Sequence, residues 1–204
     1  MMSRIRSVLP LWILANILIG ISFTFKGLFW LLFPLALSLL LFTSLKFGRQ
    51  GDISLIPSIK SIFFGAITGS LLYLIFLSTY FVIKFFDLPF LSQVKELYTI
   101  VGPSEIWHYL LLVFIIVPGE EIFWRGYIQD AISKWKNGPA GVMIAACLYT
   151  FAHLWSGNLM LVAAAFTAGV AWGALFEWKR SLVLIIVSHL VFDIWLLVVM
   201  PLNF

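Results

Sequence analysis

The chain has 204 residues, of which 62% are hydrophobic and only 11% charged, and its mean hydropathy is +1.06. A soluble domain carries about a quarter charged residues, so this composition excludes a soluble globular protein. The formal net charge is +4, and the basic residues lie mostly in loops on one side, which indicates membrane orientation and not a nucleic-acid partner. We therefore expect an all-α, polytopic transmembrane helical bundle, built as a single integral membrane domain over residues 1–204.

The apolar residues form seven runs long enough to cross a bilayer, which requires about 20 residues each. The first run has no small-residue cleavage site behind it and is followed at once by the second, so we expect an uncleaved anchor and not a signal peptide. The only long segment between runs, residues 87–106, has the spacing of a short amphipathic helix lying in the membrane interface. The predicted spans are residues 9–25, 28–45, 61–86, 107–130, 139–155, 159–176 and 182–200.

Small residues and a proline indicate special geometry inside three spans. Gly65 and Gly69 have the GxxxG spacing that lets another helix approach closely, although two glycines are also tolerated in an apolar helix without that role. Residues 159–176 are rich in Ala and Gly, which we interpret as a packing helix. Pro118 lacks a backbone donor and Gly119 loosens the next position, so we expect the fourth span to be kinked there.

Residues 119–126 read Gly-Glu-Glu-Ile-Phe-Trp-Arg-Gly and bring three charges into the fourth span. An ionised group in a bilayer costs at least about 2.5 kcal/mol, so such groups are usually paired, water-facing and functional. Glu121 and Arg125 are four residues apart, with the acid on the amino-terminal side, which favours an ion pair that supports the site structurally. Glu120 points about 100° away from Glu121 and stays available for polar groups of other helices.

The basic loop residues predict the orientation of the bundle. With the amino terminus in the cytoplasm and the carboxyl terminus outside, nine of them fall on the cytoplasmic side and three outside, in agreement with the positive-inside rule. The nine are Arg4, Arg6, Lys46, Arg49, Lys60, Lys134, Lys136, Lys179 and Arg180, and the three are Lys26, Lys84 and Lys95.

This topology places four titratable side chains near the middle of the bilayer. At roughly 1.5 Å per residue from the cytoplasmic helix ends, Glu120 lies about 15 Å deep and His153 about 21 Å deep. By the same count His189 lies about 12 Å deep and Asp193 about 18 Å deep, on one face of the last span. A single membrane histidine is as often an interhelical hydrogen-bond donor as a catalyst. Convergence from three helices, however, is harder to explain by packing alone.

Three motifs, in this order, resemble those of a known family. They are Glu-Glu-x-x-x-Arg at residues 120–125, an aromatic residue and a histidine at Tyr149 and His153, and His-x-x-x-Asp at residues 189–193. Together they resemble the CPBP intramembrane proteases, also called Abi or CAAX-protease-like, which include the Ras-converting CAAX endopeptidase and bacteriocin self-immunity proteins. The second motif usually begins with Phe where this chain has Tyr149, which we expect to support the site structurally. The resemblance covers roughly residues 107–200.

The resemblance implies a catalytic role for four residues. Glu120 would be the general base that activates water, assisted by His153, while His189 and Asp193 would stabilise the oxyanion of the tetrahedral intermediate. Amide hydrolysis requires such a base and such donors, so the implied roles agree with the chemistry. An anionic Asp193 would repel an oxyanion, which leaves two alternatives: it is protonated, or it orients His189.

The sequence leaves metal dependence open. Glu120, His153 and His189 are ligand types of a catalytic zinc site with an open fourth position, and the family has been described as metalloproteases for that reason. Family members are also described as glutamate-type endopeptidases without a tightly bound metal, and the chain has no HExxH motif. We favour catalysis without a cofactor and keep zinc as the alternative.

The resemblance implies an endopeptidase in a bacterial cytoplasmic membrane that cuts a membrane-embedded peptide or a lipidated protein. A prenylated CAAX-like protein, a peptide pheromone and a bacteriocin-related peptide all fit as substrates. Two other classes could use the same residues: a proton-coupled transporter, or a non-enzymatic immunity protein that binds a peptide. A transporter tends to have a second broken helix in an inverted repeat, and the sequence has no counterpart of Pro118-Gly119 near the polar residues of spans five and seven.

Overall fold

The computed structural model describes residues 2–47, 53–136 and 138–203, so the basic loop residue Arg49 lies outside the described ranges. Seven of the described helices are long and apolar enough to cross a membrane, which confirms the predicted polytopic all-α class. The α-helices are α1 (Met2–Thr24), α2 (Phe29–Phe47), α3 (Ile59–Phe85), α4 (Leu91–Val101), α5 (Ile106–Leu111), α6 (Val117–Glu121), α7 (Asp130–Ser133), α8 (Gly138–His153), α9 (Leu159–Lys179) and α10 (Leu182–Ile194). Short 3-10 segments are η1 (Lys26–Leu28) and η4 (Leu154–Ser156), and π-helical segments are η2 (Leu112–Ile116), η3 (Ile122–Gln129) and η5 (Trp195–Val199).

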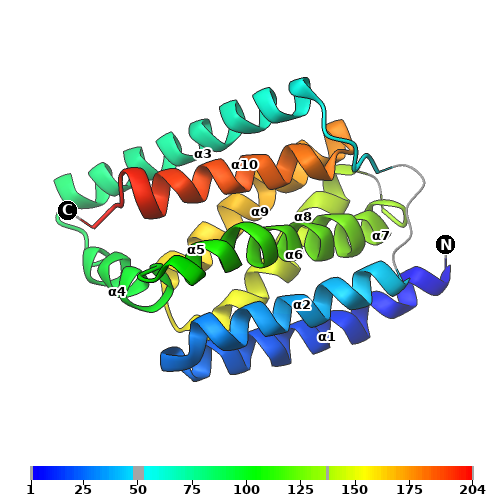
Figure 1. Ribbon diagram of the computed structural model, residues 1–204, viewed down its shortest axis with the longest axis horizontal. Coiled ribbons are helices and arrows are strands. Elements are labelled where there is room, and N and C mark those ends of the chain that lie inside the picture. Colours follow the sequence, from blue (N-terminus) through cyan, green and yellow to red (C-terminus); the bar gives the residue numbers. More distant parts are fainter. Residues whose placement is uncertain (1, 48–52, 137, 204) are drawn as a thin grey trace.

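The spans run side by side along the long axis of the molecule (Figure 1). The α1–α2 hairpin lies on one side of the fourth span, and α3 packs along α10 on the other. One end of the bundle carries α4, the α1–α2 turn, the α8–α9 turn and the carboxyl terminus, and we call it the α4 end. The other end carries the amino terminus and the segments around Lys46, Lys134 and Arg180, and we call it the basic end.

Side-chain caps begin three of the spans. Ser58 accepts a hydrogen bond from the backbone N–H of Ser61 at 3.1 Å, and the Ser181 side chain does the same for Leu184. Asn158 Oδ1 accepts from two backbone N–H groups at the start of α9, both at 3.1 Å. Since free N–H groups at a helix start have few water partners in a membrane, these caps fix where α3, α10 and α9 begin.

The fourth span departs from α-helical geometry on both sides of Pro118. The π-helical segments η2 and η3 flank the short helix α6, which contains Pro118, Glu120 and Glu121. π-Helical turns inside a helix are uncommon and occur frequently at functional sites. These π-helical turns surround the two carboxylates, and the kink expected at Pro118-Gly119 stays a prediction.

The glycines of α3 lie against α10. A Cβ atom on Gly65 would stand 2.7 Å from the carbonyl oxygen of Leu184, and one on Gly69 would overlap the carbonyl oxygen of Ser188. No side chain fits at either position without moving α10. The interpretation of this GxxxG pair as a close helix contact is therefore confirmed.

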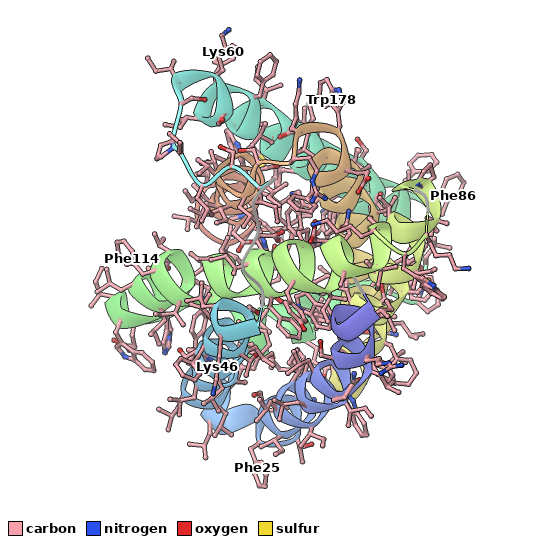
Figure 2. The ribbon with its side chains drawn as sticks, turned by 90° about the vertical axis from the view of Figure 1, so that its right-hand side faces the viewer. Phe25, Lys46, Lys60, Phe86, Phe114 and Trp178 are labelled. Carbon is pink, nitrogen blue, oxygen red and sulfur yellow. The ribbon has the colours of Figure 1, made fainter. Side chains whose placement is uncertain are left out.

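Large apolar side chains cover the outside of the bundle. Figure 2, viewed from the basic end, shows Phe25, Phe86, Phe114 and Trp178 at its periphery, and between 57% and 68% of the surface of each is exposed. Exposed apolar surface of this kind suits contact with lipid.

α4 occupies the segment in which a short helix between the third and fourth spans was predicted, and Lys95 lies on its exposed face.

Candidate functional site

Three helices bring the four candidate catalytic side chains together. Glu120 on α6, His153 on α8, and His189 and Asp193 on α10 are all at most 9% exposed. Glu120 Oε1 lies 3.9 Å from His153 Nε2, and Glu120 Oε2 lies 4.0 Å from His189 Nε2. His189 Nε2 is also 3.6 Å from Asp193 Oδ2. These separations are too long for direct hydrogen bonds, and they match polar groups that can share a small molecule between them.

The backbone of α8 and Tyr149 orient the His153 side of the site. His153 Nδ1 lies 2.9 Å from the carbonyl oxygen of Tyr149. Because a carbonyl oxygen only accepts, Nδ1 carries the proton, and Nε2 faces Glu120. The Tyr149 hydroxyl donates to Glu120 Oε1 at 3.4 Å. Tyr149 therefore contacts the carboxylate directly and also fixes the imidazole through its own main chain.

Glu121 has two partners. The predicted ion pair with Arg125 is present, with Arg125 Nη1 donating to Glu121 Oε1 at 3.2 Å. The same oxygen lies 2.7 Å from His189 Nδ1, on a residue 68 positions away in the chain. The sequence predicted only the first contact, because helical spacing carries no information on such a distant partner. Glu121 thus links the Arg125 charge to the orientation of His189.

Trp172 on α9 is a site residue that sequence reasoning missed. Its ring is stacked on the His189 imidazole with centroids 3.8 Å apart and an interplanar angle of 26°. Its indole N–H donates to Ser188 Oγ at 3.2 Å, and Thr68 donates to the same hydroxyl at 3.1 Å. The Arg125 guanidinium lies over the Trp172 ring, 5.5 Å from its centroid. Trp172 therefore packs on a face of the His189 ring, whereas Glu121 contacts the edge of the ring at Nδ1.

The four side chains face a cavity of about 170 Å³. Glu120, Tyr149, His153, His189 and Asp193 supply its polar groups. Aromatic and aliphatic residues make up most of the remaining wall, among them Phe23, Phe29, Phe33, Trp172, Phe192 and Leu196. A mostly apolar cavity with a few converging polar groups is typical of a ligand-binding or active site.

The donor types at this site suit zinc. Glu120, His153 and His189 offer a carboxylate and two imidazole nitrogens, and each Nδ1 already has another partner, as in many zinc sites. Within residues 2–47, 53–136 and 138–203, no group of three His, Cys, Asp or Glu side chains has the geometry to hold a metal ion.

The fold and the cavity define an integral membrane protein with a buried site of carboxylates and histidines. The family model described as "Type II CAAX prenyl endopeptidase Rce1-like" matches residues 102–195. No curated protein and no solved structure matched the chain. The matched segment contains all three motifs, and its similarity to this family model confirms the predicted resemblance to the CPBP, or CAAX-protease-like, intramembrane proteases. This similarity indicates a protease of the CAAX type.

Proposed function

We propose that the chain is an endopeptidase that hydrolyses a peptide bond of a membrane-associated peptide with water activated by Glu120. One observation carries this proposal: the Glu120 carboxylate lies between two imidazole Nε2 atoms, at 3.9 and 4.0 Å, in a cavity within the membrane-spanning bundle. A water molecule between a carboxylate and an imidazole can be deprotonated as it attacks a carbonyl carbon.

Glu120 and His153 bind the attacking water in this mechanism. Since Nδ1 of His153 donates to the Tyr149 carbonyl, a neutral imidazole presents the lone pair of Nε2 to the cavity. The water donates one hydrogen bond to Glu120 and one to His153 Nε2. As its oxygen bonds to the substrate carbonyl carbon, Glu120 takes the proton, and the electrons of the C=O double bond move to the oxygen.

His189 and Asp193 stabilise the resulting oxyanion. His189 uses Nδ1 to contact Glu121, so it donates from Nε2 only as the imidazolium. The Glu121 carboxylate lies 2.7 Å from the ring and compensates that positive charge, while Asp193 Oδ2 lies 3.6 Å from Nε2. Asp193 assists as a donor when it carries its proton, because an anion at this place would repel the developing charge. The intermediate collapses when the C–N bond breaks, and Glu120 returns its proton to the leaving amine.

A comparison of membrane peptides tests the proposed activity and identifies the substrate. Membranes from cells that express the parent chain and from cells that express Glu120→Ala are analysed by quantitative mass spectrometry, with both chains at equal abundance. We expect at least one membrane-associated precursor to accumulate in the Glu120→Ala cells while its shorter products disappear. Identical peptide profiles in the two membranes would contradict the proposal.

A further inference from the structure

The site cavity is built from the parts of the spans that lie nearest the α4 end. α1 contributes Phe23, the residue before its last, and α2 contributes Phe29, its first residue. α9 contributes Leu161, two residues from its start, and α4 contributes Val101. Glu120 lies near the middle of the fourth span, so it stands at the bottom of a hollow that extends toward the α4 end.

Toward the basic end the fourth span is packed against its neighbours, and a separate hollow of about 330 Å³ between α3 and α9 shares only Trp172 with the site cavity. Tyr127, Ile128 and Ile132, which follow the catalytic stretch toward this end, are at most 2% exposed. Gln129 Nε2 donates to the carbonyl oxygen of Gly173 at 2.8 Å, tying the fourth span to α9. A peptide approaching from this end would have to displace buried apolar side chains and a buried hydrogen bond, both of which stabilise the fold.

A second hollow adjoins the site cavity under α4. Its volume is about 240 Å³, and it lies between α3, α4, α9 and η5. Six residues line both hollows: Phe76, Val101, Leu161, Ala164, Leu196 and Leu197. No charged side chain is among the described residues that line the second hollow. The pair of hollows therefore offers an apolar path that begins beside α4 and ends at Glu120.

The rim of this path is tied together by polar contacts. Lys26 in the α1–α2 turn donates to Glu96 of α4 at 3.0 Å. Asn158 in the α8–α9 turn donates to the Gln93 carbonyl oxygen at 2.9 Å, and the backbone N–H of Leu159 donates to the Gln93 side chain at the same distance. These contacts fix α4 to the α1–α2 turn and the α8–α9 turn at the mouth, the place where the apolar path begins. The apolar hollows lie beneath α4.

The charge distribution tells which side of the membrane this mouth faces. Among the described residues, the α4 end carries three basic residues, Lys26, Lys84 and Lys95, whereas the basic end carries more of them: Arg6, Lys46, Lys60, Lys134, Lys136, Lys179 and Arg180. By the positive-inside rule the basic end faces the cytoplasm, and the α4 end faces away from it.

We infer that the substrate enters from the non-cytoplasmic side, by way of the apolar hollows under α4. This inference rests on the proposed proteolytic function and narrows its substrate class. The substrate is then an exported or membrane-spanning peptide whose apolar segment reaches the bilayer half next to α4. A lipidated protein presented by the cytoplasmic leaflet would meet the packed basic end and is not expected to be cut.

Single-cysteine labelling tests this inference without requiring cleavage. Val101→Cys, which lies where the two hollows meet, is made in a Cys147→Ser background, because Cys147 is exposed and would react itself. Lys95→Cys on the exposed face of α4 and Lys136→Cys at the basic end serve as orientation controls. A membrane-impermeant maleimide is then applied to intact bacterial cells and to inverted membrane vesicles.

We expect Val101→Cys and Lys95→Cys to react in intact cells, and Lys136→Cys to react only in inverted vesicles. Reaction of Val101→Cys only in inverted vesicles, or in neither preparation, would overturn the inference, and so would reversed labelling of the two controls. Failure of the proposed function would be seen separately, as membrane peptides that do not change in the Glu120→Ala comparison.

Discussion

Two groups of buried polar side chains, one toward the basic end and one at the cavity, differ in how closely their members approach one another. Toward the basic end, polar partners are in direct contact: Asp130, which is fully buried, pairs with Lys134 at 3.0 Å and with Arg180. Around the cavity, Glu120 and the two imidazole Nε2 atoms stand 3.9 to 4.0 Å apart. Groups that already satisfy one another stabilise a fold, whereas groups held just out of contact remain available to a substrate. Asp130 and its two cationic partners therefore stabilise the fold, and Glu120 with the two imidazoles provides the reactive groups.

The largest expected effect comes from breaking the ion pair that supports the site. Arg125→Ala leaves Glu121, which is fully buried, without the guanidinium group that pairs with it. Removing one member of a buried pair costs about 3 to 5 kcal/mol, so we expect Arg125→Ala to lower the melting temperature and the yield of folded protein sharply. Arg6→Ala, at an exposed position near the basic end, is the control. Equal thermal stability of the two purified variants would contradict this assignment.

The next effect separates a metal-free site from a zinc site. We expect His153→Ala and His189→Ala each to lower the cleavage rate by about 100-fold or more, because one loses a water contact and the other an oxyanion donor. The parent enzyme should contain little metal by elemental analysis and should tolerate chelators. Stoichiometric zinc that is lost together with activity on chelation, and restored together with it, would replace the proposed mechanism with a zinc-dependent one.

A smaller effect is expected from the contact between α3 and α10. A Cβ atom on Gly69 would overlap the carbonyl oxygen of Ser188, directly before His189, so Gly69→Ala must displace the histidine. Since a misplacement of about 1 Å can cost up to about 100-fold in rate, we expect activity to fall by about 10-fold with the protein still folded. Gly27→Ala is the matched control, because no atom lies within 4 Å of the added methyl. Indistinguishable cleavage rates for these variants would argue against precise placement of α10.

The smallest effect is expected at the contact between Lys26 and Glu96, which fixes α4 to the α1–α2 turn. The hydrogen bond from Lys26 and its positive charge lower the pKa of the exposed Glu96 carboxyl group. A lowered folded-state pKa means that this contact stabilises α4 above the unfolded pKa, about 4.3, and that the stabilisation is lost as the pH falls through the folded value. We expect Glu96→Gln to speed hydrogen exchange of the α4 amides by about twofold at pH 7. No difference at pH 7, or one that persists at pH 3, would contradict this account.

Local sequence patterns predicted the features that depend on helical spacing. The Glu121–Arg125 pair and the contact face of Gly65 and Gly69 follow from residues three or four positions apart, and the structure contains both. Apolar runs likewise predicted all seven spans, because the bilayer thickness sets their length. The π-helical turns on both sides of Pro118 were not predicted, because they depend on packing against other helices.

Tertiary contacts within the site could not be predicted from the sequence. Trp172 and Trp178 lie in the same helix, yet Trp172 is 2% exposed and stacks on His189 while Trp178 is 68% exposed. Hydropathy is the same for a lipid-facing and a buried side chain in a membrane, so it does not distinguish the two. The Glu121–His189 contact could not be predicted either, because it depends on how α6 and α10 are rotated about their axes.

The rate of cleavage by purified Glu120→Gln tests the central claim most directly. The substitution keeps the size of the side chain and removes the basic carboxylate, so the account predicts a protein that melts like the parent and cleaves the substrate at least about 100-fold more slowly. Glu105→Gln, a matched change at an exposed position that lines neither hollow, should retain the parent rate. A folded Glu120→Gln protein that cleaves the same substrate at the parent rate would contradict the assignment of Glu120 as the base.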